Sequence, residues 1–129
     1  MYEYHGWLTL SCDTYEEDDV CLQTAINNIR DYVDKLNWVT GKIEIYAING
    51  QFHLCISGFD NHKPIEKYNP VNILEYIAER AKGSYGMLYI RDSENNHSHN
   101  CFKVYVLARG ELSEKEDMYL SPCNPIIED

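Results

Sequence analysis

The stretch KIEIYAINGQFHLCIS, residues 42–57, decides the fold of this chain. Polar and apolar residues alternate on both sides of Asn49-Gly50, from Lys42 to Ile48 and from Gln51 to Ser57. Alternation at period two places successive side chains on opposite faces of a strand. Asn-Gly suits a two-residue turn because both turn residues must adopt positive φ. The stretch therefore predicts a β-hairpin.

An amphipathic helix is predicted on each side of this hairpin. Thr14 opens the first helix, with Glu17 at capping-box spacing. Its apolar stripe is Leu22, Ile26, Ile29, Val33 and Leu36. Asn69-Pro70 begins the second helix and Gly83 ends it. Its stripe is Val71, Leu74, Ile77, Ala78 and Ala81.

Three further strands complete the predicted order β-α-β-β-α-β-β, at residues 2–12, 87–91 and 101–108. We expect an α+β fold, a single mixed or antiparallel sheet with two helices packed on one face. Residues 1–129 would form a single domain, with residues 110–129 as a polar C-terminal tail packed on it. Two large rings are expected in the core, Trp7 in the first strand and Trp38 after the first helix; an exposed tryptophan would instead indicate a binding hot spot.

The charge of the chain is unevenly distributed. The net charge is −10. Residues 1–41 carry eight acids and two bases, residues 42–109 seven acids and eight bases, and residues 110–129 six acids and one base. This balance argues against direct binding to nucleic acid or to an anionic membrane, because both need a basic surface. It favours a basic protein partner, which a field of one sign attracts and steers.

The acids at the two ends of the chain are therefore the predicted partner-binding residues. They are Glu16, Glu17, Asp18 and Asp19 at the first helix, and Glu111, Glu114, Glu116 and Asp117 in the tail. Asp92 and Glu94, in the connector at residues 92–100, are secondary candidates. Neighbouring tyrosines would supply the buried anchors, since rim charges mainly speed association.

The cysteines and the hydropathy pattern predict a cytoplasmic protein. No apolar stretch approaches 18 residues. The five cysteines are odd in number, widely spaced and without a CxxC motif: Cys12, Cys21, Cys55, Cys101 and Cys123. In a reducing cytosol we expect them to be small buried hydrophobic residues.

Two groups of residues could support catalysis. Asp92, Glu94, His97 and His99 are types that bind metal ions, but a polar connector offers few outer partners to hold such ligands. Cys55 has His53 two residues away on the same strand face, the pairing a thiol nucleophile needs. A solvated loop explains the connector residues better than a metal site does. Core packing explains Cys55 and His53 better than catalysis does. We therefore predict no catalytic residue, no metal site and no cofactor.

Short motifs in order along the chain resemble the immunity protein 7 family of bacterial polymorphic toxin systems. The resemblance runs almost the full length. The motifs are YHGW at residues 4–7, TYEED at 14–18, NW at 37–38, NG at 49–50, SG at 57–58, NH at 61–62, GSYG at 83–86, LYIRD at 88–92, VYVL at 104–107, LSPCNP at 120–125 and ED at 128–129.

The resemblance implies an inhibitor that binds a cognate toxin domain and protects the producing cell and its kin, as in contact-dependent inhibition. Many such toxins are nucleases, whose phosphate-gripping surfaces are basic, so an acidic inhibitor would suit them. We expect a monomer or weak dimer without enzymatic activity. Two alternatives stay open: a small metal- or cysteine-dependent hydrolase, and a non-inhibitory subunit of a larger assembly.

Overall fold

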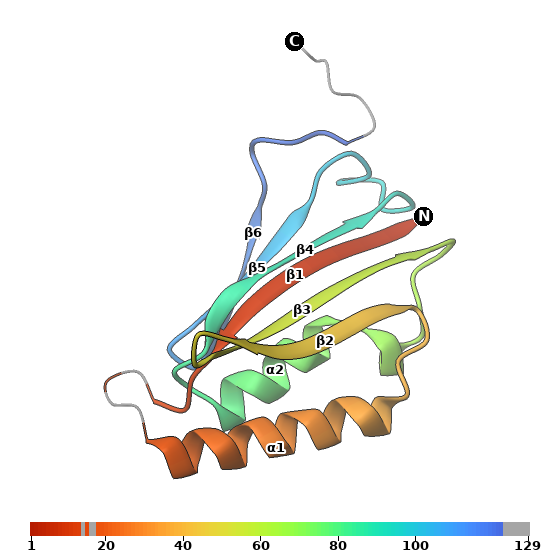
Figure 1. The fold of residues 1–129 in the computed structure, drawn as a ribbon. Coiled ribbons are helices and arrows are strands. Elements are labelled where there is room, and N and C mark those ends of the chain that lie inside the picture. The colour runs from red at the N-terminus through yellow and green to blue at the C-terminus, as the bar shows by residue number, and fades with distance from the viewer. Residues whose placement is uncertain (14, 16–17, 123–129) are drawn as a thin grey trace.

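Six strands form one antiparallel sheet, and both helices lie against the same face of it (Figure 1). This computed structural model describes residues 1–13, 15 and 18–122. The strand order across the sheet is β2-β3-β1-β4-β5-β6. The elements are β1 (Tyr2–Leu10), α1 (Asp19–Leu36), β2 (Gly41–Ile48), β3 (Gln51–Asp60), the 3-10 turn η1 (Glu66–Tyr68), α2 (Val71–Arg80), β4 (Tyr85–Asp92), β5 (Lys103–Ala108) and β6 (Glu111–Glu116). The predicted α+β class and the shared helical face are confirmed.

The predicted central hairpin is confirmed. β2 and β3 pair directly up to Ile48 and Gln51, which leaves Asn49-Gly50 as the two-residue turn. Asn49 has φ of 51° and Gly50 of 80°, the positive values that this kind of turn requires.

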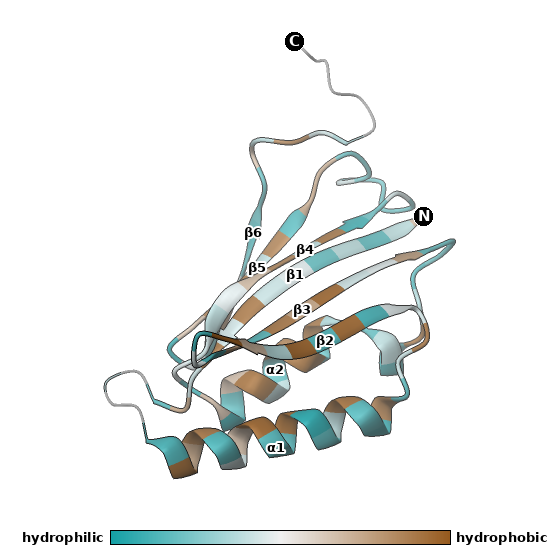
Figure 2. Cartoon of the chain, in the orientation of Figure 1, coloured by the Kyte–Doolittle hydropathy of each residue, from teal (hydrophilic) through white to brown (hydrophobic). Residues whose placement is uncertain are grey.

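The core lies between the sheet and the helices. β1 contributes Tyr2, Tyr4, Leu8 and Leu10, all almost fully buried. The predicted helix stripes meet these residues: Leu22, Ile26 and Ile29 of α1 and Leu74 and Ile77 of α2 are buried, while Val33 and Leu36 are partly buried against them. Figure 2 shows the polar outer side of α1 in teal. Amphipathic periodicity therefore placed both helices correctly.

Helix α1 begins later than predicted. The structure places its first residue at Asp19, while the predicted start at Thr14 and its partner Glu17 lie outside the described residues. Asp18 is the N-cap, and its carboxylate accepts hydrogen bonds from the backbone N–H groups of Val20 and Cys21. Aspartate is a better N-cap than threonine, which explains the later start.

The predicted polar tail contains a sixth strand, β6. Arg109 and Gly110 both have positive φ, at 53° and 75°, and turn the chain back so that Glu111–Glu116 pairs with β5. Sequence reasoning missed this strand because Leu112 is its one apolar residue. Charged side chains are typical of an edge strand, where they discourage pairing with another chain. The Arg109-Gly110 pair was the sequence signal available for the turn between β5 and β6.

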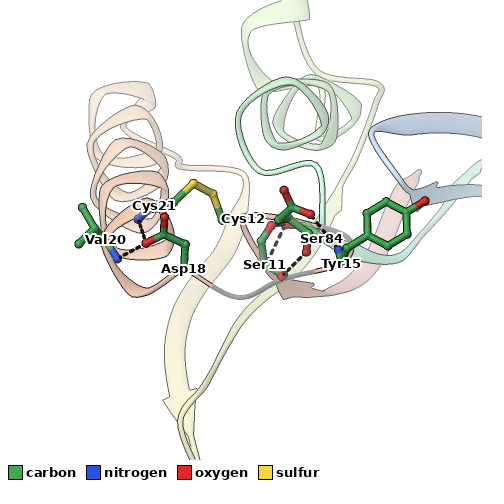
Figure 3. The surroundings of a disulfide bond; sticks show 8 residues. Ser11, Cys12, Tyr15, Asp18, Val20, Cys21 and Ser84 are labelled. Carbon is green, nitrogen blue, oxygen red and sulfur yellow. Dashed lines mark hydrogen bonds between the residues drawn. A yellow bond between two sulfur atoms is a disulfide. The ribbon is translucent and has the colours of Figure 1, made fainter.

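Two of the cysteines form a disulfide, contrary to the prediction that they are buried hydrophobic residues. Cys12 follows β1 and Cys21 lies in the first turn of α1, with their Cα atoms 5.9 Å apart (Figure 3). Cys55 and Cys101 are free and partly exposed, and Cys123 lies outside the described residues. Folding brings the end of β1 next to the start of α1, a closeness that cysteine spacing alone does not reveal.

Loss of this disulfide is expected to destabilise the fold. The Cys12→Ser/Cys21→Ser variant should lose about 2–3 kcal/mol of unfolding free energy, because the crosslink restricts a loop of about ten residues in the unfolded chain. Urea denaturation with and without reductant measures the difference. The double variant should not respond to reductant, whereas Cys55→Ser/Cys101→Ser should keep the full response. A wild-type protein equally stable with and without reductant would contradict the prediction.

Candidate functional site: the uncovered face of the sheet

The sheet face opposite the helices carries exposed aromatic side chains. In β1, Tyr4 and Leu8 point to the helices, so His5, Trp7 and Thr9 point the other way. Trp7 is 44% exposed, although the sequence analysis expected it in the core. That expectation is wrong because the helices cover the other face of the strand.

Trp7 lies near the middle of this face. β1 is an inner strand, and Trp7 is directly opposite Cys55 of β3 and Met87 of β4. Its indole meets the ring of Tyr85 edge-on, with ring centroids 6.3 Å apart. The register places further exposed residues on the same face: Tyr46, Ile48, Phe59 and Tyr85. We call the whole sheet face that carries these residues and Trp7, opposite the helices, the aromatic face.

A shallow hollow of about 400 Å³ adjoins Trp7. Its polar lining includes His5, Lys42, Glu44 and Ser57, and Tyr89 contributes a ring. Lys42 and Glu44 of β2 form an exposed ion pair at 3.6 Å. The hollow therefore combines an apolar floor with groups that can donate and accept hydrogen bonds.

The connector closes one end of this face. The Arg91 guanidinium, with a side chain only 5% exposed, donates to the Glu3 carboxylate at 3.3 Å and to the His99 carbonyl at 3.4 Å. The ring of Phe102 packs against His5 and Tyr89. The face is therefore bounded at the connector end and open along the strands.

The Cys55 and His53 side chains have separate partners. The Tyr46 hydroxyl and the Cys55 thiol are 3.1 Å apart, and His53 Nδ1 is 3.4 Å from Thr9 Oγ1. The hydrogen bond with Cys55 raises the pKa of Tyr46. The Cα atoms of residues two apart on a strand are separated by about 6.6 Å, and here each of the two side chains contacts a residue of a neighbouring strand. This arrangement does not pair a nucleophile with a base.

The connector residues are tied into loop contacts. Asp92 accepts a hydrogen bond from the Glu94 backbone N–H, and the Glu94 carboxylate is 3.0 Å from His62 Nδ1. The His97 backbone N–H donates to Asn95. Within residues 1–13, 15 and 18–122, no group of three or more His, Cys, Asp or Glu side chains is arranged to hold a metal ion.

The predicted partner-binding acids lie in several places. Asp18 caps α1, Asp19 is exposed beside it, and Glu16 and Glu17 lie outside the described residues. Glu111 begins β6 at the end of the molecule where α1 also begins, and the strand then runs away from it (Figure 1). Among the predicted acids that the structure describes, folding therefore does not gather the two groups into one patch.

Two acids of the C-terminal group already have partners. Glu114 is 3.6 Å from Lys103, and Asp117 accepts hydrogen bonds from the backbone N–H groups of Tyr119 and Leu120. Glu116, by contrast, is exposed at the end of β6. The exposed Asp19, Glu111 and Glu116 are the acids best placed to meet another protein.

The family model for Immunity protein 7 matches residues 1–129, the whole length of the sequence. The chain belongs to the immunity protein 7 family. No curated protein and no solved structure matches it. Membership in the immunity protein 7 family implies that the chain is an immunity protein with a toxin as its partner. In the described part of the chain, no helix is long and apolar enough to cross a membrane.

Proposed function

We propose that this member of the immunity protein 7 family binds a cognate toxin domain in the cytoplasm and neutralises it as a stoichiometric inhibitor. The family match over the whole chain carries this proposal. The net charge of −10 supports a basic partner, and a nuclease domain is a natural candidate because its substrate is a polyanion. The separate partners of Cys55 and His53 favour inhibition over hydrolysis.

Co-expression with the toxin tests the proposal. The cognate toxin domain should arrest growth when produced alone and lose that effect when this protein is co-produced. A purified one-to-one complex should show no toxin activity. Binding without loss of toxicity would instead support the non-inhibitory subunit. A toxin from an unrelated system is the control, since the inhibitor should protect from its cognate toxin alone.

The exposed acids would steer the toxin. Asp19→Lys/Glu116→Lys reverses the charge of one acid in each predicted group. It leaves Asp18 in place, because loss of this N-cap would cost about 1 kcal/mol of helix stability. We expect the association rate at low salt to fall about tenfold and its salt dependence to flatten. Stopped-flow mixing at several salt concentrations measures both.

A matched variant separates local contact from overall charge. Glu75→Lys/Glu79→Lys changes the net charge by the same amount on α2, at exposed positions outside the predicted set. It should slow association less than Asp19→Lys/Glu116→Lys. Equal effects of the two variants would mean that the net charge of the whole protein steers the toxin. The predicted acids would then play no special role in association.

A further inference from the structure

The aromatic face is nearly neutral within a strongly acidic protein. Its charged residues are three acids, Glu3, Glu44 and Glu111, and three bases, Lys42, Arg91 and Lys115. The other described residues carry 14 acids and eight bases, so among the described residues the excess of negative charge lies outside this face. Such a contrast is typical of an interface in which a weakly charged centre is buried and a charged surround steers the partner.

We propose that the toxin domain docks on the aromatic face, with Trp7 as the central anchor, an inference that rests on the proposed function. Trp7, Tyr46 and Tyr85 are of the residue types that dominate binding energy when a partner buries them. Trp7 lies on an inner strand, and energetic hot spots concentrate near the centre of an interface. The partner presents an apolar patch to these rings and basic residues to the acids around them.

The size of the face suits such a partner. Six strands about 4.8 Å apart span about 24 Å, and eight residues extend about 26 Å. The flat area of the face is therefore about 600 Å², and the side chains that project from it increase the accessible area. A stable protein interface buries about 800 Å² on each partner. One compact domain can therefore cover the face.

Charge argues against a second copy of this chain as the occupant. Two copies would each carry a net charge of −10 around a nearly neutral contact, and whole molecules of like charge repel. A basic domain is attracted by the same field. The proposed partner is therefore a domain of opposite charge.

Alanine variants at two exposed aromatic positions test the docking site. The probe is the catalytically inactivated cognate toxin domain. Trp7→Ala should raise its Kd about 30-fold or more, the loss expected of a hot spot. Tyr15→Ala is the matched control, because Tyr15 is 93% exposed and lies beside the acids before α1. It should change Kd less than threefold.

The outcomes separate docking from inhibition. Failure of the wild-type protein to bind or protect would overturn the proposed function. Binding by the wild type with no loss in Trp7→Ala, or a larger loss in Tyr15→Ala, would overturn docking on the aromatic face. The wild-type protein could also form a dimer without toxin that Trp7→Ala converts to a monomer. That result would assign the face to a second copy of the chain and would equally overturn docking of the toxin there.

Fluorescence provides a measurement that keeps the anchor side chain intact. The Trp38→Phe variant leaves Trp7 as the single tryptophan of the chain. On binding the toxin domain, made for this purpose without tryptophan, its emission should move to shorter wavelength and become less accessible to acrylamide. Unchanged emission and quenching in a saturated complex would contradict burial of Trp7.

Discussion

Replacement of Glu3 by alanine is expected to lower the free energy of unfolding by about 3–5 kcal/mol. Glu3 pairs with Arg91 across β1 and β4, and both side chains are largely buried, at 14% and 5% exposure. Removal of the carboxylate takes a negative charge at 3.3 Å away from a poorly hydrated guanidinium, which keeps its hydrogen bond to the His99 carbonyl. Urea denaturation of the wild type and Glu3→Ala measures the loss.

An exposed ion pair on the same sheet provides the control. Glu44 is 3.6 Å from Lys42, and both side chains are exposed. Glu44→Ala should change the unfolding free energy by less than about 1 kcal/mol, because water screens the pair. Glu3→Ala/Arg91→Met should recover much of the loss, since the buried positive charge is then removed together with the carboxylate. Similar small effects of Glu3→Ala and Glu44→Ala would contradict the importance of burial.

Replacement of Gly58 by valine is expected to destabilise the fold by about 3 kcal/mol, at the upper end for overpacking. A Cβ atom at Gly58 would overlap ring atoms of Tyr4, which is fully buried. The ring cannot move freely, because its hydroxyl accepts a hydrogen bond from Trp38 Nε1 at 3.1 Å and is 2.8 Å from the Thr40 hydroxyl. Thermal unfolding followed by circular dichroism measures the effect.

Two further variants identify the cause of this loss. Ser57→Ala, at the exposed neighbouring position, should stay within about 0.5 kcal/mol of the wild type. In a Trp7→Phe background, where Trp38 is the single tryptophan, Gly58→Val should also change the fluorescence, since displacement of Tyr4 removes the partner of the Trp38 indole N–H. A loss of stability with unchanged Trp38 emission would contradict a clash with Tyr4 as its cause.

Local patterns predicted the parts of the fold that local physics controls. The alternation around Asn49-Gly50 predicted the β2–β3 hairpin, and the stripes at Leu22 and Leu74 predicted the buried sides of both helices. These predictions succeeded because turn geometry and amphipathic periodicity act within a few residues. β6 was missed because its partner strand, and not its own composition, stabilises it. The disulfide was missed because the tertiary fold brings Cys12 to Cys21.

The sequence by itself determined that this chain is an acidic α+β domain of the immunity protein 7 family, since charge, periodicity and family motifs are all properties of residue order. The tertiary structure alone decided where Trp7 points. Alternation along β1 assigns Tyr4 and Trp7 to opposite faces, but it does not say which face the helices cover. Packing of α1 and α2 over Tyr4 left Trp7 in solvent, because a single layer of helices can bury just one side of a sheet.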